Sequence, residues 1–189
     1  MEFIRNLRSK VGYALLRRKV RATDRSVKAV HLYSAKKAAV VFRATGQADF
    51  ELIQNFIKTM KEEGVDVSAV GFVKEKKIPN MFLLRKGYSF FCLEDLNWYC
   101  KPIAPFVESF LKEKFDILID LNLERCLPLD YLVYLADAGF KAGKHFVGDH
   151  PFDLTIDVNK NNNLAYLIDQ LQHYLSLINK PVKHETADI

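Results

Sequence analysis

Short apolar runs alternate along this chain with longer stretches in which apolar residues recur at helical spacing. The runs cover residues 38–42, 65–73 and 115–121, and the helical stretches cover residues 49–63, 104–114, 127–138 and 164–178. A buried parallel strand is apolar throughout, whereas a helix that covers a sheet is apolar along one face. Strands that alternate with helices in this way predict a parallel sheet with helices on both sides.

The run at 115–121, with the sequence FDILIDL, is expected to be the central strand. The helix at 127–138 carries few charges, so we expect another element to cover it, and Gly139 is expected to end it. Residues 139–145 and 152–158 predict further strands, the second with one polar face. The sequence therefore predicts a three-layer α/β domain, Rossmann-like or flavodoxin-like, whose mainly parallel sheet has about five strands.

Residues 2–20 predict an added N-terminal helix with an apolar side and a basic side. The apolar residues near one face are Phe3, Leu7, Val11, Ala14 and Leu15. In the simplest arrangement this apolar side packs on the domain and the basic side chains stay in solvent.

The first 37 residues differ in charge from the rest of the chain. They hold eleven of the 28 Lys and Arg residues but only two of the 23 acids, a net charge of +9, while the other 152 residues carry −4. A local positive field of this kind is typical of an element that faces a polyanion. The residues expected to contact that polyanion are Arg5, Arg8, Arg17, Arg18, Lys19 and Arg21.

Our first hypothesis for function is therefore a non-catalytic binding module whose basic helix contacts RNA or a ribonucleoprotein. Its affinity for RNA would fall steeply as salt is added. A basic amphipathic helix is equally suited to an anionic membrane surface, so a peripheral membrane protein is an alternative.

Length and composition predict one domain with an appendage: an arm at 1–37, the α/β domain at 38–180 and a frayed tail at 181–189. No apolar run approaches the roughly 18 residues that span a bilayer, so we predict no integral membrane segment. The N-terminus lacks the unbroken apolar core of a secretory signal. The three cysteines show no CxxC spacing, which favours reduced thiols and a cytoplasmic location.

A possible ligand crevice is predicted where the strands end. The loop at 43–48 follows the first strand and precedes a helix, and its Thr45 and Gly46 form a candidate ligand loop, although it lacks the glycine-rich nucleotide motifs. Asp49, Asp120 and Glu124 are the candidate catalytic acids at this edge. The alternative is that these acids cap helices and bind loop amides.

Other chemistry finds little support in the sequence. His145, Asp149 and His150 are close together but lack the spacing of a zinc site, so we predict no metal, and no motif indicates a cofactor. Trp98, Tyr99 and Phe91 can stack on a base or ring, although we expect them to pack in the core or against a partner instead. With no nucleophile beside a matched base, an enzyme is the less favoured class.

Two segments resemble part of a known enzyme family. FDILIDLNL at 115–123 and LVYLADAGFKAG at 132–143 are similar to the strand–helix–strand unit in one half of heptosyltransferase-type glycosyltransferases, which have the GT-B fold. That family places a catalytic acid in a Gly-Asp pair after its first strand, and here Gly46 and Asp49 are two residues apart. The resemblance implies an enzyme that binds a nucleotide or sugar nucleotide, as a further alternative.

The whole layout resembles a short uncharacterised bacterial family seen chiefly in Bacteroidetes. The resemblance rests on the basic N-terminal helix, on AAVVF and FDILIDL, and on LPLDYL and AGFKAG, and it spans most of the chain. It implies a cytoplasmic single-domain protein and no mechanism.

Overall fold

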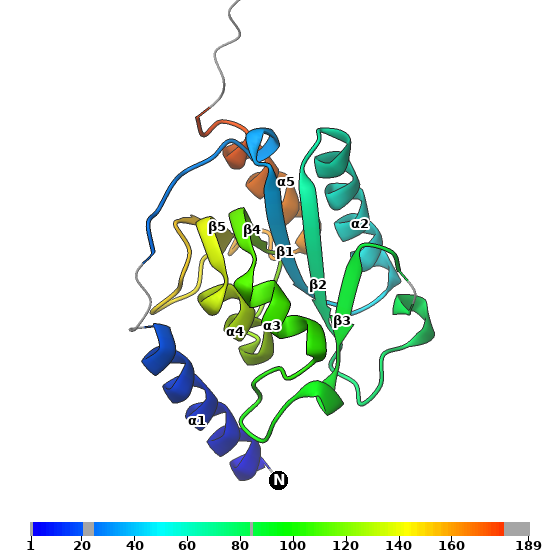
Figure 1. Cartoon of the computed structure of the whole chain (residues 1–189), viewed down its shortest axis with the longest axis vertical. Coiled ribbons are helices and arrows are strands. Elements are labelled where there is room, and N and C mark those ends of the chain that lie inside the picture. The colour runs from blue at the N-terminus through cyan, green and yellow to red at the C-terminus, as the bar shows by residue number, and fades with distance from the viewer. Residues whose placement is uncertain (1, 21–24, 84, 180–189) are drawn as a thin grey trace, which may run out of the picture.

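The structure is a computed structural model that describes residues 2–20, 25–83 and 85–179, the side chains of residues 2–5 excepted (Figure 1). Its strands are β1 (Lys37–Arg43), β2 (Asp66–Phe72), β3 (Tyr88–Phe91), β4 (Lys114–Asp120), β5 (Asp137–Lys144) and β6 (Leu154–Ile156). Its α-helices are α1 (Glu2–Val20), α2 (Gln47–Glu62), α3 (Pro105–Lys112), α4 (Leu127–Leu135) and α5 (Leu164–Leu175). Short 3-10 turns occur at η1 (Leu32–Ser34), η2 (Asn80–Phe82) and η3 (Leu93–Asp95).

The six strands form one sheet in the order β3-β2-β1-β4-β5-β6, and every neighbouring pair is parallel. The predicted α/β fold is confirmed, and β4 lies inside the sheet as expected. This strand order is that of a Rossmann fold, in which the chain builds outward from β1 in one direction and then from β4 in the other. The switch between β1 and β4 opens a crevice at the carboxyl ends of these two strands.

Each face of the sheet carries its own apolar core. On one face α2 and α5 pack over the strands through residues such as Phe50, Ile53 and Leu171. On the other face α3 and α4 pack through residues such as Phe110 and Leu132. Side chains along a strand alternate between faces, so the unbroken apolar run of β1 supplies both cores.

Helix α1 packs on the outer side of α4, which confirms that the charge-poor helix is covered (Figure 1). Leu16 lies against Leu127 and Tyr131, whose hydroxyl donates a hydrogen bond to the Gly12 carbonyl at 2.9 Å. A Cβ at Gly12 would lie 2.4 Å from the Tyr99 carbonyl oxygen and 2.7 Å from Leu127 Cδ2. Only glycine therefore permits this close approach.

The prediction for the face of α1 that packs on the domain is wrong. Gly12 and Leu16 face the domain, whereas Leu7 is 49% exposed, Leu15 is 37% exposed and Ala14 lies in solvent. The side chain of Phe3 lies outside the described part. Helix α1 has two apolar stripes, and the one that contains a glycine fits closely against α4.

The predicted end of the fourth helix is also wrong. Helix α4 ends at Leu135, and β5 begins at Asp137, where its pairing with Lys114 of β4 starts. Pairing along the whole edge of β4 outweighs the helical pattern of Asp137 and Ala138. Beyond β5, residues 145–153 reach the three-residue strand β6 without any helix, so the α4 side of the sheet lacks a helix at this position.

Candidate functional site

The structure brings three of the predicted residues together at the switch point. Thr45, Asp49 and Glu124 line a cavity of about 330 Å³ at the carboxyl ends of β1 and β4, together with Arg43 and Asn122. Gly46 is the N-cap residue of α2, with an extended backbone that any residue can adopt. The predicted grouping of Thr45, Asp49 and Glu124 was sound because parallel strands end at a common edge.

The charges of this crevice are largely paired with one another. Arg43 Nη1 lies 3.2 Å from Glu124 Oε2, and the Thr45 hydroxyl donates to Asp49 Oδ2 at 2.5 Å. The backbone N–H of Arg43 donates to Asn122 Oδ1 at 2.8 Å. Asp49 therefore contacts a side chain of its own loop and Glu124 contacts one of β1, and Asp49 occupies the first turn of α2, where a phosphate would otherwise bind.

Asp120, the third predicted acid, does not line the crevice. It is only 3% exposed and accepts hydrogen bonds from the backbone N–H and the side-chain amide of Asn122. Burial raises the pKa of Asp120 to about 8, and the nearby Asp130 carboxyl adds to the increase. A buried carboxyl that does not line the crevice is not positioned to contact a ligand there.

Asp130 of α4, whose carboxyl raises the pKa of Asp120, also contacts α1. Burial also raises the pKa of Asp130, and the Tyr13 hydroxyl of α1 donates to Asp130 Oδ2 at 2.7 Å. Burial and Asp130 together raise the pKa of Tyr13. The Tyr13 hydroxyl thus joins α1 to a buried carboxyl on α4.

The three cysteines are free thiols. Cys92 is buried, and Cys100 and Cys126 are half-buried. Burial raises the pKa of Cys126 to about 12, so it is a poor nucleophile near neutral pH.

The basic residues of α1 differ in their surroundings. Arg8 donates to the carbonyl oxygens of Trp98 at 2.5 Å and Asn97 at 3.4 Å, and so ties the helix to the loop before α3. Arg17, Arg18 and Lys19 are exposed. Within the described residues neither Arg17 nor Arg18 pairs with a carboxylate. The Arg5 side chain and Arg21 lie outside the described residues.

Arg8 also places an aromatic residue beside α1. Trp98 is 61% exposed, and its ring lies edge-on to that of Tyr99 with centroids 5.5 Å apart. Trp98 therefore does not pack in the core, and packing against a partner, the other arrangement that we expected, stays a prediction. Phe91, from the same aromatic region, is fully buried in the α3 and α4 core.

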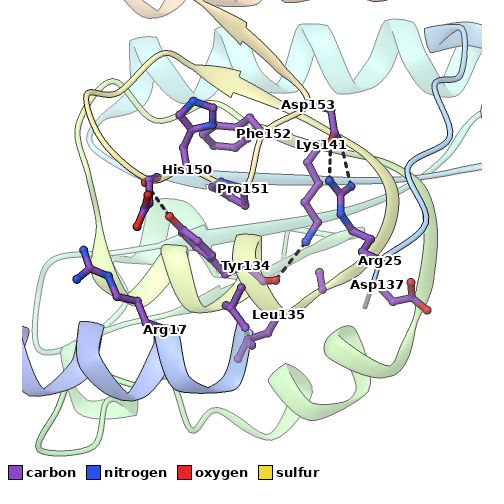
Figure 2. Close-up of a pocket in the computed structure, with 13 residues that line it drawn as sticks. Arg17, Arg25, Tyr134, Leu135, Asp137, Lys141, His150, Pro151, Phe152 and Asp153 are labelled. Atoms are coloured by element: carbon purple, nitrogen blue, oxygen red, sulfur yellow. Dashed lines mark hydrogen bonds and ion pairs between the residues drawn. The ribbon is translucent and has the colours of Figure 1, made fainter. Parts of the chain in front are cut away.

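A second cavity has no counterpart in the sequence-based predictions. It measures about 720 Å³ and lies where the end of α1, the end of α4, β5 and residues 149–153 meet (Figure 2). Arg17, Arg25 and Lys141 line it. The one signal in the sequence is a lysine at the centre of a strand, with glycines two residues away on either side.

Lys141 is buried, at 2% exposure, with its side chain directed to the end of α4 (Figure 2). Its Nζ donates to the carbonyl oxygens of Val133 at 2.7 Å and Tyr134 at 3.2 Å. Burial lowers the pKa of Lys141 to about 8, and Arg25 adds to the decrease. Arg25 itself is neutralised by Asp153 through bonds of 2.5 and 2.9 Å.

Two further properties can be stated for the part of the chain that the structure describes. No cluster of three or more His, Cys, Asp or Glu side chains there has a geometry that could hold a metal ion. None of the helices there has the length and hydropathy needed to cross a bilayer.

A comparison with known protein families gives one match. The sequence profile of a family of unknown function, DUF6913, covers residues 8–178. A comparison with curated proteins gives no match.

Proposed function

The chain belongs to the DUF6913 family of unknown function, and we propose that it is a peripheral binding module that docks on anionic lipid surfaces through α1. The observation that carries this proposal is the outward direction of an apolar stripe on a basic helix. Leu7, Val11 and Leu15 follow one another at four-residue steps, so they form a line along the helix. Leu7 and Leu15 are substantially exposed, and no element among the described residues covers them.

Cations flank this stripe. Lys10 and Arg17 are seven residues apart and lie to one side of it, while Arg18 continues the line beyond Leu15. All three are exposed. A helix that lies in a membrane interface has this arrangement, with apolar side chains among the acyl chains and Lys and Arg at the anionic headgroups. RNA would attract the cations but would leave the leucines in water.

The exposed Trp98 adds to this surface. Its loop is held to α1 by Arg8, so the indole lies beside the helix rather than in the core. Tryptophan favours the boundary between headgroups and acyl chains, because its ring is apolar and its N–H needs a polar partner.

The expected strength fits a reversible association. Lys10, Arg17 and Arg18 contribute about 1 kcal/mol each near an anionic surface. The exposed parts of Leu7 and Leu15 add about 1 kcal/mol each on leaving water. A total of about 5 kcal/mol holds a protein on vesicles without anchoring it permanently.

Co-sedimentation of the full chain with vesicles tests the proposal. We expect binding to vesicles that contain phosphatidylglycerol and none to vesicles of phosphatidylcholine alone, with loss of binding at high salt. Replacing Leu7→Ser and Leu15→Ser should reduce binding about tenfold or more. The matched control is Leu52→Ser with Leu177→Ser, because these leucines are 37% and 56% exposed on the α2 and α5 side.

RNA binding, the first hypothesis from the sequence, is the competing outcome. Fluorescence anisotropy with a single-stranded RNA oligonucleotide measures it, and Trp98 is positioned for base stacking in that case. RNA binding would respond to Arg17→Gln, Arg18→Gln and Trp98→Ala but not to the leucine variant. Tight RNA binding without vesicle binding would overturn the lipid proposal.

A further inference from the structure

The cavity beside α1 contains a buried lysine whose charge has no carboxylate partner. An ammonium group has three N–H donors, and Nζ of Lys141 uses two of them on Val133 and Tyr134. Among the residues that the structure describes, no carboxylate forms an ion pair with it. Buried charges are normally paired, so the third donor and much of the charge are available to a ligand.

Neighbouring side chains do not neutralise the charge of Lys141. The carboxylate of Asp153, which opposes the fall in the pKa of Lys141 more than Asp137 does, is engaged by both Nη atoms of Arg25 and by the backbone N–H of Lys141. The α4 carbonyls supply only the partial negative charge of a helix C-terminus. Lys141 is therefore better placed to receive an anion than to serve as one half of an internal pair.

A second unsatisfied group lines the same cavity. Nδ1 of His150 is buried and has no hydrogen-bond partner among the described residues. Buried polar atoms without a partner are rare in folded proteins, and they often mark the position of an absent ligand or water. Arg17, which makes no ion pair within the described chain, adds a cation from α1.

The cavity also has the dimensions of a ligand site. Its volume of about 720 Å³ lies within the range of small-molecule sites, roughly 300–1,000 Å³. It exists because residues 145–153 connect β5 to β6 without a helix, so the layer over β5 is incomplete. Gly143 allows the Phe152 ring, which lines the cavity, to pack against β5, since a Cβ there would lie 2.7 Å from that ring.

We propose that this cavity binds a small molecule that carries a phosphate or carboxylate group, with the anion against Lys141 and the remainder extending toward Arg17. The same chemistry is found in soluble phosphate esters and in lipid headgroups. The site goes beyond lipid docking by the outward stripe of α1, because it contains none of the exposed leucines; Arg17 is the residue that both sites share.

Binding of glycerol 3-phosphate to the full chain, with glycerol as the uncharged comparison, tests the proposal. We expect the phosphate ester, and not glycerol, to raise the melting temperature and to slow acylation of Lys141, followed by mass spectrometry. Lys141 is suited to this measurement because its pKa, lowered to about 8, gives more neutral amine than a surface lysine has. Inorganic phosphate and citrate extend the set of probes.

Two substitutions locate the bound anion. Lys141→Met should weaken binding at least tenfold, because a charge-assisted hydrogen bond is lost. Arg17→Gln should weaken it a few-fold, while Arg18→Gln, the next residue on α1 and not part of the lining, should not. If Lys141→Met fails to fold, the acylation measurement on the wild-type chain still decides.

The outcomes separate this site from lipid docking. The Leu7→Ser and Leu15→Ser variant should bind soluble probes as the wild type does. Protection of Lys141 by phosphatidylglycerol vesicles alone would support the site with a headgroup as its source. Absence of protection by every probe and vesicle, or binding that Lys141→Met and Arg17→Gln leave unchanged, would overturn the proposal.

Discussion

The two faces of the sheet are completed in different ways. Helices α2 and α5 cover one face, and the core between them and the sheet is apolar from β1 to β6. On the other face α3 and α4 cover the central strands, but no helix lies between β5 and β6 in the chain. Helix α1 and residues 145–153 cover that face only in part, and they leave the large cavity (Figure 1, Figure 2).

The ionisable groups follow this difference. The buried Asp, Glu, Lys and Arg residues of the described chain are Asp120, Asp130 and Lys141, and all three are on the face of α4. Each has a pKa shifted by burial toward its neutral form. The face covered by α2 and α5 has no buried Asp, Glu, Lys or Arg among the described residues, whereas the face of α4 has three of them and a cavity. Ionisable groups with shifted pKa values cluster at functional sites, so the face of α4 is the better candidate for a functional surface.

The largest effect on stability is expected from a substitution in the core beneath α2 and α5. Phe50 lies on the inner side of α2, where its ring contacts those of Phe42, Phe82 and Phe90. Phe50→Ala should lower the free energy of unfolding by about 3–5 kcal/mol in urea titrations, because a cavity replaces the ring. Leu16→Ala, on the inner side of α1, should lower the free energy of unfolding by less, about 2 kcal/mol. Equal costs would show that α1 is as integral to the fold as α2.

The contribution of Asp120, a buried acid on the face of α4, to the free energy of unfolding should depend on pH. The pKa of Asp120 in the folded protein is about 8, above its ordinary value of 3.8, so folding favours the protonated form. Wild-type stability should therefore fall as pH rises between these values, by up to about 1.4 kcal/mol per pH unit. Asp120→Asn keeps an acceptor for Asn122 and removes the titration. The variant should match the wild type near pH 4 and exceed it by about 4 kcal/mol at neutral pH.

Unfolding measured across this pH window gives the test for Asp120. Asp49→Asn is the matched control, since Asp49 lies in the open crevice and not in the core. A constant difference between Asp120→Asn and the wild type would contradict a raised pKa.

The packing of α1 on the domain should be sensitive to any side chain placed at position 12. Gly12→Val places side-chain atoms against the Tyr99 carbonyl, which is backbone and cannot rotate away. We expect a loss of about 1–3 kcal/mol, or release of α1 with little change in the rest of the domain. Hydrogen exchange distinguishes the two, because release exposes the amides of α1 alone. Val11→Ala, on the outward stripe, should leave exchange in α1 unchanged.

The smallest change in stability is expected from a substitution in the crevice at the carboxyl ends of β1 and β4. The ion pair between Arg43 and Glu124 is largely exposed on the Glu124 side. Glu124→Gln should change stability by less than about 1 kcal/mol, because water and salt screen such pairs. A larger loss in thermal unfolding would mean that this crevice carries strain, and would direct attention back to it.

The sequence alone was sufficient for the sheet and for part of the crevice. The apolar runs at β1, β2 and β4 identify buried parallel strands, and helical spacing identifies the helices between them. Thr45, Asp49 and Glu124 meet because the ends of neighbouring parallel strands share an edge. These features depend on local periodicity and on chain topology, which a sequence displays directly.

Tertiary packing decided the rest. Helix α1 carries two apolar stripes, and its periodicity does not predict which of them packs on α4. The close contact that Gly12 permits places its own stripe against the domain, so Leu7 and Leu15 face solvent. The cavity around Lys141 likewise depends on a missing helix between β5 and β6, which only the arrangement of the layers makes evident. The pattern along a chain sets which residues prefer burial, but shape complementarity between elements decides which of them are buried.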